Sequence, residues 1–377
     1  MIVRRPWARP LVPLYRAGLH VEAWLRHTGV SRTRWLQHPV ISVGSLSAGG
    51  AGKTPVVLAL AALLRDAGWH PDVLTRGYGR SVRDVEQVLL PHTSTAMKIA
   101  SAELPHPNGT AMLNVNDTAE QSAEYADAAA MRYGDEAVLL AARGKIPVWV
   151  GSNRYAAGTA AEATESVDAS RRVHLLDDGF QHRELGRSLD IVLITQEDLD
   201  DSLLPAGNLR EPLASLARAG AVVVRAEEMD AVAPKVWPLL SEGTQMWTVA
   251  RSLRMPSPLG VLSAGLRPVA FCGIARPEGF AQALARAGCS VVDTIVFNDH
   301  QPLERRQIAE IIHFARELKA TGLMTTEKDF VRLAPRAIRE LEEQVGPLVV
   351  AALHAELVRP ERVTASLNAL LNAETAR

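Results

Sequence analysis

The chain has 377 residues, more than one compact core usually holds, and this length predicts two domains. Hydrophobic residues make up 47% of the chain, charged residues make up 22%, and the formal net charge is -1, which excludes a disordered chain and a general nucleic-acid binder. Two cysteines are too few for a disulfide framework or for a structural zinc site, which fits a reducing, cytoplasmic setting. No apolar run reaches the ~20 residues of a membrane span.

Residues 1–37 differ from the rest of the chain in charge. They contain seven arginines and a single acid, Glu22. The same stretch contains three tryptophans: Trp7, Trp24 and Trp35. Apolar side chains recur at every fourth position: Leu11, Tyr15, Leu19 and Ala23. This spacing predicts an amphipathic helix, which either lies in a membrane interface with its arginines near anionic head groups or packs on its own domain.

From His38 onward, short apolar runs alternate with helical patterns. Strands are expected at 39–45, 70–79, 146–152, 172–179, 190–196 and 220–226. A helix is expected at 56–68, where Gly68 ends it. This alternation is typical of an α/β fold, with a parallel sheet covered by helices on both faces. The polar, proline-containing segment 91–130 interrupts the pattern and is expected to be an inserted surface loop.

A second α/β set follows a looser stretch. It comprises strands at 268–274, 290–297, 322–326 and 346–353, helices near 277–288 and 303–319, and a last helix. The expected organisation is a helix at 1–37, a kinase-type domain at 38–226, a linking segment at 227–266 and a smaller α/β domain at 267–377. A cleft between two such domains is a common place for a functional site.

The segment "SAGGAGKTP" (47–55) has most of a phosphate-binding loop, although serine replaces the first glycine of the usual pattern. A strand is expected before it and a helix after it, as such a loop requires. Backbone N–H groups would face phosphates, Lys53 would reach the β- and γ-phosphates, and the Thr54 hydroxyl would bind Mg²⁺. The nucleotide-binding residues expected here are Ser47, Ala48, Gly49, Gly50, Ala51, Gly52, Lys53 and Thr54.

Asp177 and Asp178 end an apolar strand in "HLLDDGFQH" (174–182), which is the place of a Walker-B acid. An acid at this position holds Mg²⁺ directly or through water. The other interpretation is a helix-cap or turn pair, which is more plausible for one aspartate than for two. The upstream phosphate-binding loop favours the metal site.

Three further segments bear on what accepts the phosphate. Asp135 and Glu136 follow a glycine before a helix, Arg210 and Glu211 lie in a loop, and "FNDHQPL" (297–303) has Asp299 and His300 just after a strand. Each pair alone is also typical of a helix cap, a surface ion pair or a polar turn.

Taken together, these segments resemble the tetraacyldisaccharide 4'-kinase family of lipid A biosynthesis. The matching motifs are "GSLSAGGAGKTP", "RGYGR", "GDE", "LDDGFQH", "LPAGNLRE", "FNDH" and "TTEKD", in that order, within roughly residues 10–335. The resemblance implies a phosphate-loop NTPase domain of RecA-like α/β fold, a second, smaller α/β domain and the amphipathic N-terminal helix. That family also lacks the first consensus glycine of the loop, so Ser47 is no departure from it.

The resemblance implies ATP- and Mg²⁺-dependent transfer of the γ-phosphoryl group to the 4'-hydroxyl of a tetraacylated glucosamine disaccharide 1-phosphate, which yields lipid IV-A. It further implies contact with the cytoplasmic face of the bacterial inner membrane through the N-terminal region. It implies neither a nucleic-acid partner nor a protein partner.

Residue roles follow by position in the motifs. Asp135 matches the base that takes the hydroxyl proton, and His300 matches the histidine that supports it. Lys53 and Arg210 would offset charge on the transferring group. Mg²⁺ would be held by Thr54 with Asp177 or Asp178, and Glu211 is a further candidate ligand. Gln181 would line the nucleotide or substrate cleft, together with His182, Arg76 and Tyr78.

Two other functions are compatible with a phosphate-binding loop. A GTPase-type metallochaperone would need a guanine-reading N-K-x-D, which is absent and only approached by "TEKD". A nucleotide-binding membrane scaffold would bind ATP without transferring phosphate. Two departures from the family are the long segment 91–130 and Arg276, which stands where many relatives have histidine and is assigned no catalytic role.

Overall fold

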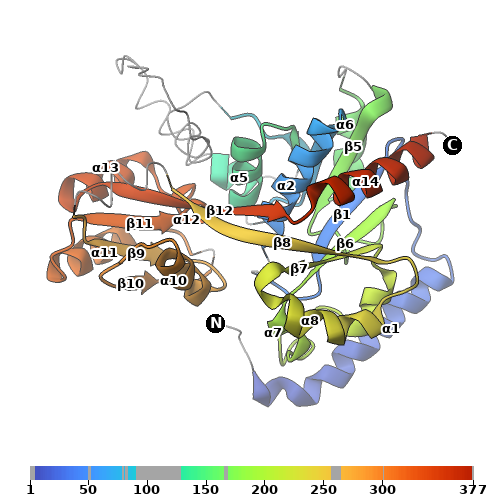
Figure 1. Ribbon diagram of the computed structural model, residues 1–377, viewed down its shortest axis with the longest axis horizontal. Coiled ribbons are helices and arrows are strands. Elements are labelled where there is room, and N and C mark those ends of the chain that lie inside the picture. Colours follow the sequence, from blue (N-terminus) through green and yellow to red (C-terminus); the bar gives the residue numbers. More distant parts are fainter. Residues whose placement is uncertain are drawn as a thin grey trace.

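The computed structural model describes residues 5–49, 52–78, 80, 84–90, 129–164, 169–255, 265–299 and 301–375 (Figure 1). A sheet of 12 strands runs through the molecule in the order β10-β9-β11-β12-β8-β7-β6-β1-β5-β2-β4-β3. The strands are β1 (Val40–Ser45), β2 (His70–Thr75), β3 (Glu86–Gln87), β4 (Val148–Val150), β5 (Arg172–Asp177), β6 (Leu189–Ile194), β7 (Ala221–Arg225), β8 (Gln245–Arg254), β9 (Pro268–Cys272), β10 (Thr294–Val296), β11 (Gly322–Thr326) and β12 (Leu348–Leu357).

Helices cover both faces of the sheet, as the alternating sequence pattern predicts. They include α1 (Val12–His27), α2 (Lys53–Asp66), α5 (Asp135–Gly144), α6 (Arg154–Glu162), α7 (Gln196–Leu199), α8 (Met229–Val236), α10 (Pro277–Arg286), α11 (Arg305–Glu317), α12 (Glu327–Phe330), α13 (Pro335–Gln344) and α14 (Pro360–Thr375). Alternate residues of β1, Ile41 and Val43, share one core with α2 and α5, whereas Val192 of β6 and Val222 of β7 face α8 in another.

The first lobe has β1, β2, β4, β5, β6 and β7 in parallel, and β7 is also parallel to β8. The second lobe has β9, β10 and β11 parallel to β12. The two sets meet where β8 pairs antiparallel with β12, from Ala352 opposite Arg254 to Leu357 opposite Val249. The strands of the two lobes therefore run in opposite directions. Because only the C-terminal halves of β8 and β12 pair with each other, the carboxyl edges of the two sets of strands face each other.

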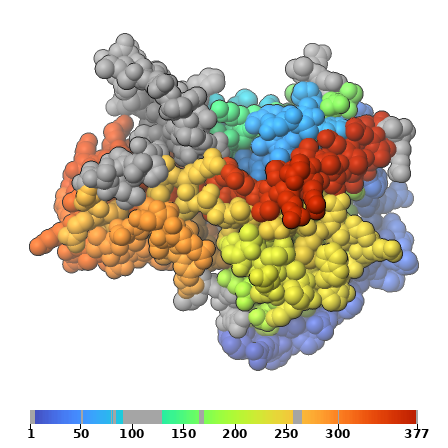
Figure 2. All heavy atoms as spheres, in the orientation of Figure 1, coloured from blue at the N-terminus to red at the C-terminus, as the bar shows by residue number. Residues whose placement is uncertain are grey.

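Further contacts join the lobes. The Arg143 guanidinium at the end of α5 contacts the Glu327 carboxylate of α12 at 2.9 Å, and both side chains are almost fully buried. The main hydrophobic core includes Val57 of α2, Phe271 of β9 and Leu371 of α14. Figure 2 shows α14 in red lying along α2 in blue, where Trp69 Nε1 donates to Asn368 Oδ1 at 2.7 Å. The last helix thus packs on the first lobe, and the segment expected as a link contributes α8 and β8.

Helix α1 lies along the lower side of the first lobe in Figure 1. Its inner side has half-buried residues, including Tyr15, whose hydroxyl donates to the Arg210 carbonyl oxygen at 2.9 Å. The large apolar side chains that stay exposed on α1 and the turn before it are Trp7, Leu11, Leu14, Val21 and Trp24. Among the described residues, the helices are too short or too polar to cross a bilayer.

Candidate active site

The phosphate-binding loop connects the end of β1 to the start of α2, as the sequence predicts. Gly52 caps α2 with φ 85°, and a Cβ there would meet nothing within 4 Å, so the loop leaves open space before the helix N-terminus. The backbone N–H of Ala48 donates to the Asn208 carbonyl oxygen at 2.8 Å, and this bond holds the loop against the 203–210 segment. Ser47 has no positive φ, so serine adds no backbone strain there. Gly50 and Ala51 lie outside the described residues.

Ser45, at the end of β1, joins three of the predicted site residues. The Lys53 ammonium donates to Ser45 Oγ at 3.3 Å, and the carbonyl oxygen of Ser45 accepts hydrogen bonds from Gln181 Nε2 and Arg210 Nη2, both at 3.1 Å. Thr54, the second residue of α2, is half-buried beside Lys53. The strand end therefore gathers cations where phosphates would lie.

Asp178 neutralises these cations. Arg210 donates to both of its carboxylate oxygens, at 2.7 and 2.9 Å, and the Lys53 ammonium lies 3.3 Å away. Burial disfavours the ionised carboxyl, but Lys53 and Arg210 outweigh it and hold the pKa of Asp178 well below its usual range. Asp178 therefore holds Lys53 and Arg210 in place with its negative charge.

Asp177 has a different environment one residue earlier. Its Oδ2 accepts from Thr75 at 3.2 Å, whereas its Oδ1 is buried with no hydrogen-bond partner. Burial, Glu136 and Asp178 raise the pKa of Asp177 to about 7. A buried carboxylate oxygen with no partner and excess negative charge around it suit a divalent cation, so the residues present fit Mg²⁺.

Asp135 is the first residue of α5 and lies at the junction of the lobes. It follows Gly134, whose φ is 90° and where a Cβ would meet the Tyr78 carbonyl oxygen at 2.8 Å, so only glycine fits this turn. The Asp135 carboxylate accepts from the Glu136 backbone N–H at 2.9 Å and from Arg332 Nε at 2.9 Å. Arg332 belongs to the second lobe and also donates to the Gly273 carbonyl oxygen.

The "FNDH" segment reaches the same junction. The Lys328 ammonium, at the start of α12, lies 3.5 Å from the Glu136 carboxylate and 3.4 Å from that of Asp299. Asp299 is thus joined through one lysine to the residue after Asp135. His300 itself lies outside the described residues. Residues 91–128 of the insertion expected at 91–130 also lie outside them.

A group of basic side chains lies beside the Walker-B strand, near the end of α1. Burial, then Arg154, Arg187, Arg26 and Arg76, lower the pKa of His182 to about 4, which keeps its ring neutral. Burial and Arg76 lower the pKa of Arg154 to about 10. Buried guanidinium nitrogens of Arg26 and Arg154 have no hydrogen-bond partner, so this surface has unused donors for an anion.

Comparison with known proteins identifies the family and the fold. The family model described as Tetraacyldisaccharide-1-P 4'-kinase matches residues 4–99 and 115–372. The chain belongs to this family. A tetraacyldisaccharide 4'-kinase of Koribacter versatilis is 35% identical over 355 residues, covering 92% of this chain and 94% of the relative. That of Geobacter metallireducens is 32% identical, covering 95% of each.

A solved structure is similar over nearly the whole chain. LpxK from Aquifex aeolicus, described as an "apo" form in complex with ATP, matches with a TM-score of 0.67 and 26% identity, covering 97% of this chain and 98% of that one. Membership confirms the expected α/β phosphate-loop fold and makes the chain an enzyme, a kinase of lipid A biosynthesis that uses ATP.

Glu211, a predicted Mg²⁺ ligand, and Arg276, which was assigned no catalytic role, each pair with a charged side chain of this kinase. Glu211 contacts the Arg218 guanidinium at 2.8 and 3.2 Å, and Arg218 in turn lies over the Phe180 ring. Arg276 contacts Glu197 of α7 at 2.9 Å and so links the lobes. Sequence reasoning did not single out Ser45, Thr75, Lys328 or Arg332, although Lys328 lies within the quoted "TTEKD" motif.

Proposed function

We propose that the chain transfers the γ-phosphoryl group of ATP to the 4'-hydroxyl of a tetraacylated glucosamine disaccharide 1-phosphate. The bond from the γ-phosphorus to the β-phosphate oxygen breaks, a bond to the 4'-oxygen forms, and Asp135 takes the hydroxyl proton. The observation that carries this assignment is the facing of two carboxyl edges. The carboxyl edge of the first lobe presents Lys53 and Asp177. Asp135 lies where the second lobe meets this edge, paired with Arg332.

Each residue has a separate part in the proposed step. Lys53 and Arg210 offset the charge of the transferring group, and Asp178, which contacts both, keeps them oriented. Thr54 and Asp177 would hold Mg²⁺, which supplies positive charge to the phosphates of the nucleotide. Glu211 is a further candidate ligand only if it leaves Arg218. We expect the backbone N–H groups of the loop 47–54 to bind the nucleotide phosphates, apart from that of Ala48, which donates to the Asn208 carbonyl oxygen. Gln181 is expected to line the same cleft.

Asp135 acts as base only after its pairing with Arg332 loosens. We propose that His300, which follows Asp299 in the second lobe, takes over the support of Asp135 in the loaded enzyme. The link from Asp299 through Lys328 to Glu136 supports this proximity. A histidine paired with a carboxylate orients it and tunes its pKa.

The phosphate of the acceptor needs a cationic site of its own. The basic group formed by Arg26, Arg76 and Arg154 supports its placement there, because these side chains lie near Asp177 and Asp178 and near the end of α1. The assay that tests the whole assignment follows labelled γ-phosphate from ATP into the disaccharide 1-phosphate with Mg²⁺. Hydrolysis of ATP without labelled lipid would contradict it.

Helix α1 is proposed to contact the cytoplasmic face of the inner membrane, from which the acylated acceptor would be reached. Leu14 and Val21 are seven residues apart and so lie on one side of the helix, with Trp24 beside them, while Tyr15 faces the protein. An exposed apolar stripe with tryptophan suits the interface between head groups and acyl chains.

Glutamate in this stripe should weaken membrane binding. A buried Leu or Trp side chain contributes ~1.5–3 kcal/mol or more, so Leu14→Glu combined with Trp24→Glu is expected to lower partitioning onto anionic vesicles at least ~10-fold. Trp237→Glu is the matched control, because Trp24 and Trp237 are both 61% exposed. Co-sedimentation measures the effect, and equal binding of the double variant and the control would refute the role of α1.

A further inference from the structure

A buried group of polar side chains lies away from the proposed reaction. His38 precedes β1, Asp72 lies in β2, His174 lies in β5 and Glu162 is the last residue of α6. In the sheet, His174 is opposite Val40 on one side and Asp72 on the other, near the amino ends of the strands. The phosphate-binding loop and Asp177 lie at the carboxyl ends, so this group has no part in phosphoryl transfer.

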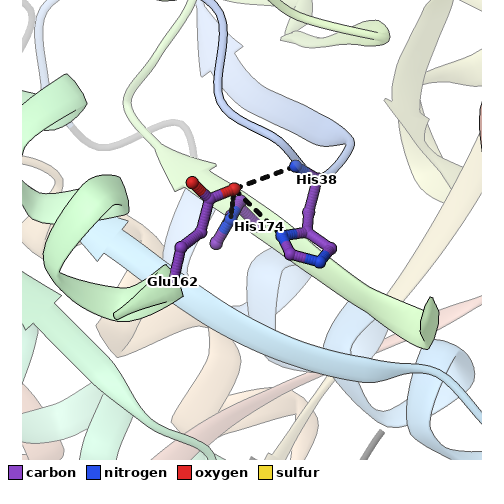
Figure 3. A group of neighbouring side chains, drawn as sticks. All are labelled: His38, Glu162 and His174. Carbon is purple, nitrogen blue, oxygen red and sulfur yellow. Dashed lines mark hydrogen bonds and ion pairs between the residues drawn. The ribbon is translucent and has the colours of Figure 1, made fainter. Parts of the chain in front are cut away.

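The side chains of His38, Glu162 and His174 converge on one carboxylate oxygen (Figure 3). His38 Nδ1 lies 2.9 Å from Glu162 Oε1, and His174 Nε2 lies 3.4 Å from the same oxygen. The three ligand atoms lie within 4.8 Å of one another. They come from three separate elements, so the arrangement depends on the tertiary fold and not on one local turn.

Asp72 fixes the orientation of the most buried ring. His174 Nδ1 lies 2.7 Å from Asp72 Oδ1, and the His174 side chain is fully buried. With Nδ1–H donating to Asp72, the neutral ring presents the lone pair of Nε2 toward Glu162. A carboxylate behind a histidine, which sets its tautomer and orientation, is the usual partner of a metal-binding imidazole.

The chemistry and charge of the group favour a divalent transition metal. Two imidazoles and one carboxylate are a common zinc set, with water as the fourth ligand. With neutral rings, Glu162 and Asp72 leave two negative charges in a poorly solvated place, and α6 ends there with the negative end of its dipole. The side chains of His38 and Glu162 keep 16% and 10% exposure, which gives an ion and its water a way in.

We propose that His38, Glu162 and His174 bind one Zn²⁺ ion, with Asp72 holding His174 in place. The ion fastens the end of α6 to the segment that enters β1 and to the central strand β5. The proposed ion takes no part in phosphoryl transfer, because the phosphate-binding edge lies at the other ends of the same strands.

A proton is the competing way to balance these charges. Burial disfavours a charged ring, but Asp72 and Glu162 raise the pKa of His174 to about 9, so a metal-free group contains an imidazolium between two carboxylates. The arginine nearest to the group in sequence, Arg172, is engaged with the Ala161 and Thr164 carbonyl oxygens. Zinc and the proton therefore compete for the same nitrogen, and direct metal measurements distinguish them.

The test uses the full chain, stripped with a chelator and kept in excess MgCl₂ so that the phosphate-binding edge does not take up zinc. We expect about one zinc per chain by elemental analysis after gel filtration, and a higher Tm with zinc than without. Cobalt in place of zinc should give the visible absorption of a four-coordinate site. Failure of the wild-type chain to retain zinc or to show the cobalt band overturns the proposal.

Variants locate the site. His38→Gln removes a ligand at the half-buried side and is expected to abolish both the zinc-induced rise in Tm and the cobalt band. Asp72→Asn keeps all three ligands and is expected to weaken zinc binding ~10–100-fold. His313→Gln, on the exposed side of α11, is the matched control. Zinc binding that survives His38→Gln, or that falls equally with His313→Gln, would refute the assignment.

Discussion

Replacement of Asp135 by asparagine is expected to lower kcat by about 10²–10⁴-fold, the range that a general base contributes, while ATP still binds. Asparagine keeps the shape of the side chain and can still accept the hydrogen bond of the Glu136 backbone N–H. It cannot take the proton of the acceptor hydroxyl. Transfer to the disaccharide and binding of an ATP analogue are the two measurements.

A substitution of Arg332, the partner of Asp135, distinguishes the effect of Asp135→Asn on catalysis from its effect on stability. Loss of the carboxylate leaves the buried Arg332 guanidinium without one of its acids, which costs up to ~3 kcal/mol of folding free energy. The double variant Asp135→Asn with Arg332→Met removes both charges and is expected to regain part of that loss, because Arg332→Met also takes a cation from the buried Asp329 carboxylate. If the double variant also regains activity, the defect of the single variant was structural and Asp135 is not the base.

Asp177→Asn is expected to have opposite effects on activity and on stability. The variant loses the carboxylate proposed to hold Mg²⁺, so transfer should fall by ~10²-fold or more. Burial with Glu136 and Asp178 raises the pKa of Asp177 to about 7, so above this pH the fold has to keep a charge it disfavours. The neutral amide should therefore raise the free energy of unfolding at pH 8, by ~2 kcal/mol.

The sign of the pH dependence follows from the raised pKa. A raised carboxyl pKa stabilises the fold fully below the unfolded pKa near 4, and this contribution is lost as the pH rises through about 7. The gain from Asp177→Asn should thus disappear toward pH 4. Asp178→Asn is the matched control: its pKa is depressed by Lys53 and Arg210, so at pH 8 it should destabilise the chain. Thermal unfolding in chelator without nucleotide measures the stability of both variants. A destabilised Asp177→Asn variant at pH 8 would contradict the raised pKa of Asp177.

Local sequence pattern was enough for much of this architecture. Strand, glycine turn and helix are encoded by neighbouring residues, so the place of Lys53 and Thr54 at the start of α2 followed from the sequence alone. Asp177 and Asp178 could be placed at a strand end for the same reason. Their separate roles could not, because the unpaired Oδ1 of Asp177 and the ion pairs of Asp178 depend on Thr75 and Arg210.

The contacts between the lobes could not be predicted from any local sequence pattern. Arg332 and Lys328 follow strand β11, and nothing in their neighbourhood points to Asp135 or Glu136 almost 200 residues earlier. What brings them together is the antiparallel pairing of β8 with β12, which turns the second lobe toward the first. The strand expected at 290–297 is also short, Thr294–Val296, because only these residues pair with β9.

The pairing of β8 with β12 also determines how the lobes can move. Each strand is ten residues long, and each belongs to one lobe at its start and to the shared ladder at its end. Two-stranded ribbons twist more strongly than wide sheets do, whereas pulling the two strands apart breaks the hydrogen bonds between them. We therefore expect the lobes to rotate about this ribbon more readily than they separate, once contacts such as Arg143–Glu327 and Asp135–Arg332 loosen. Substitutions within β8 and β12 are therefore expected to change how the lobes are placed relative to each other, although these strands lie away from the proposed binding residues.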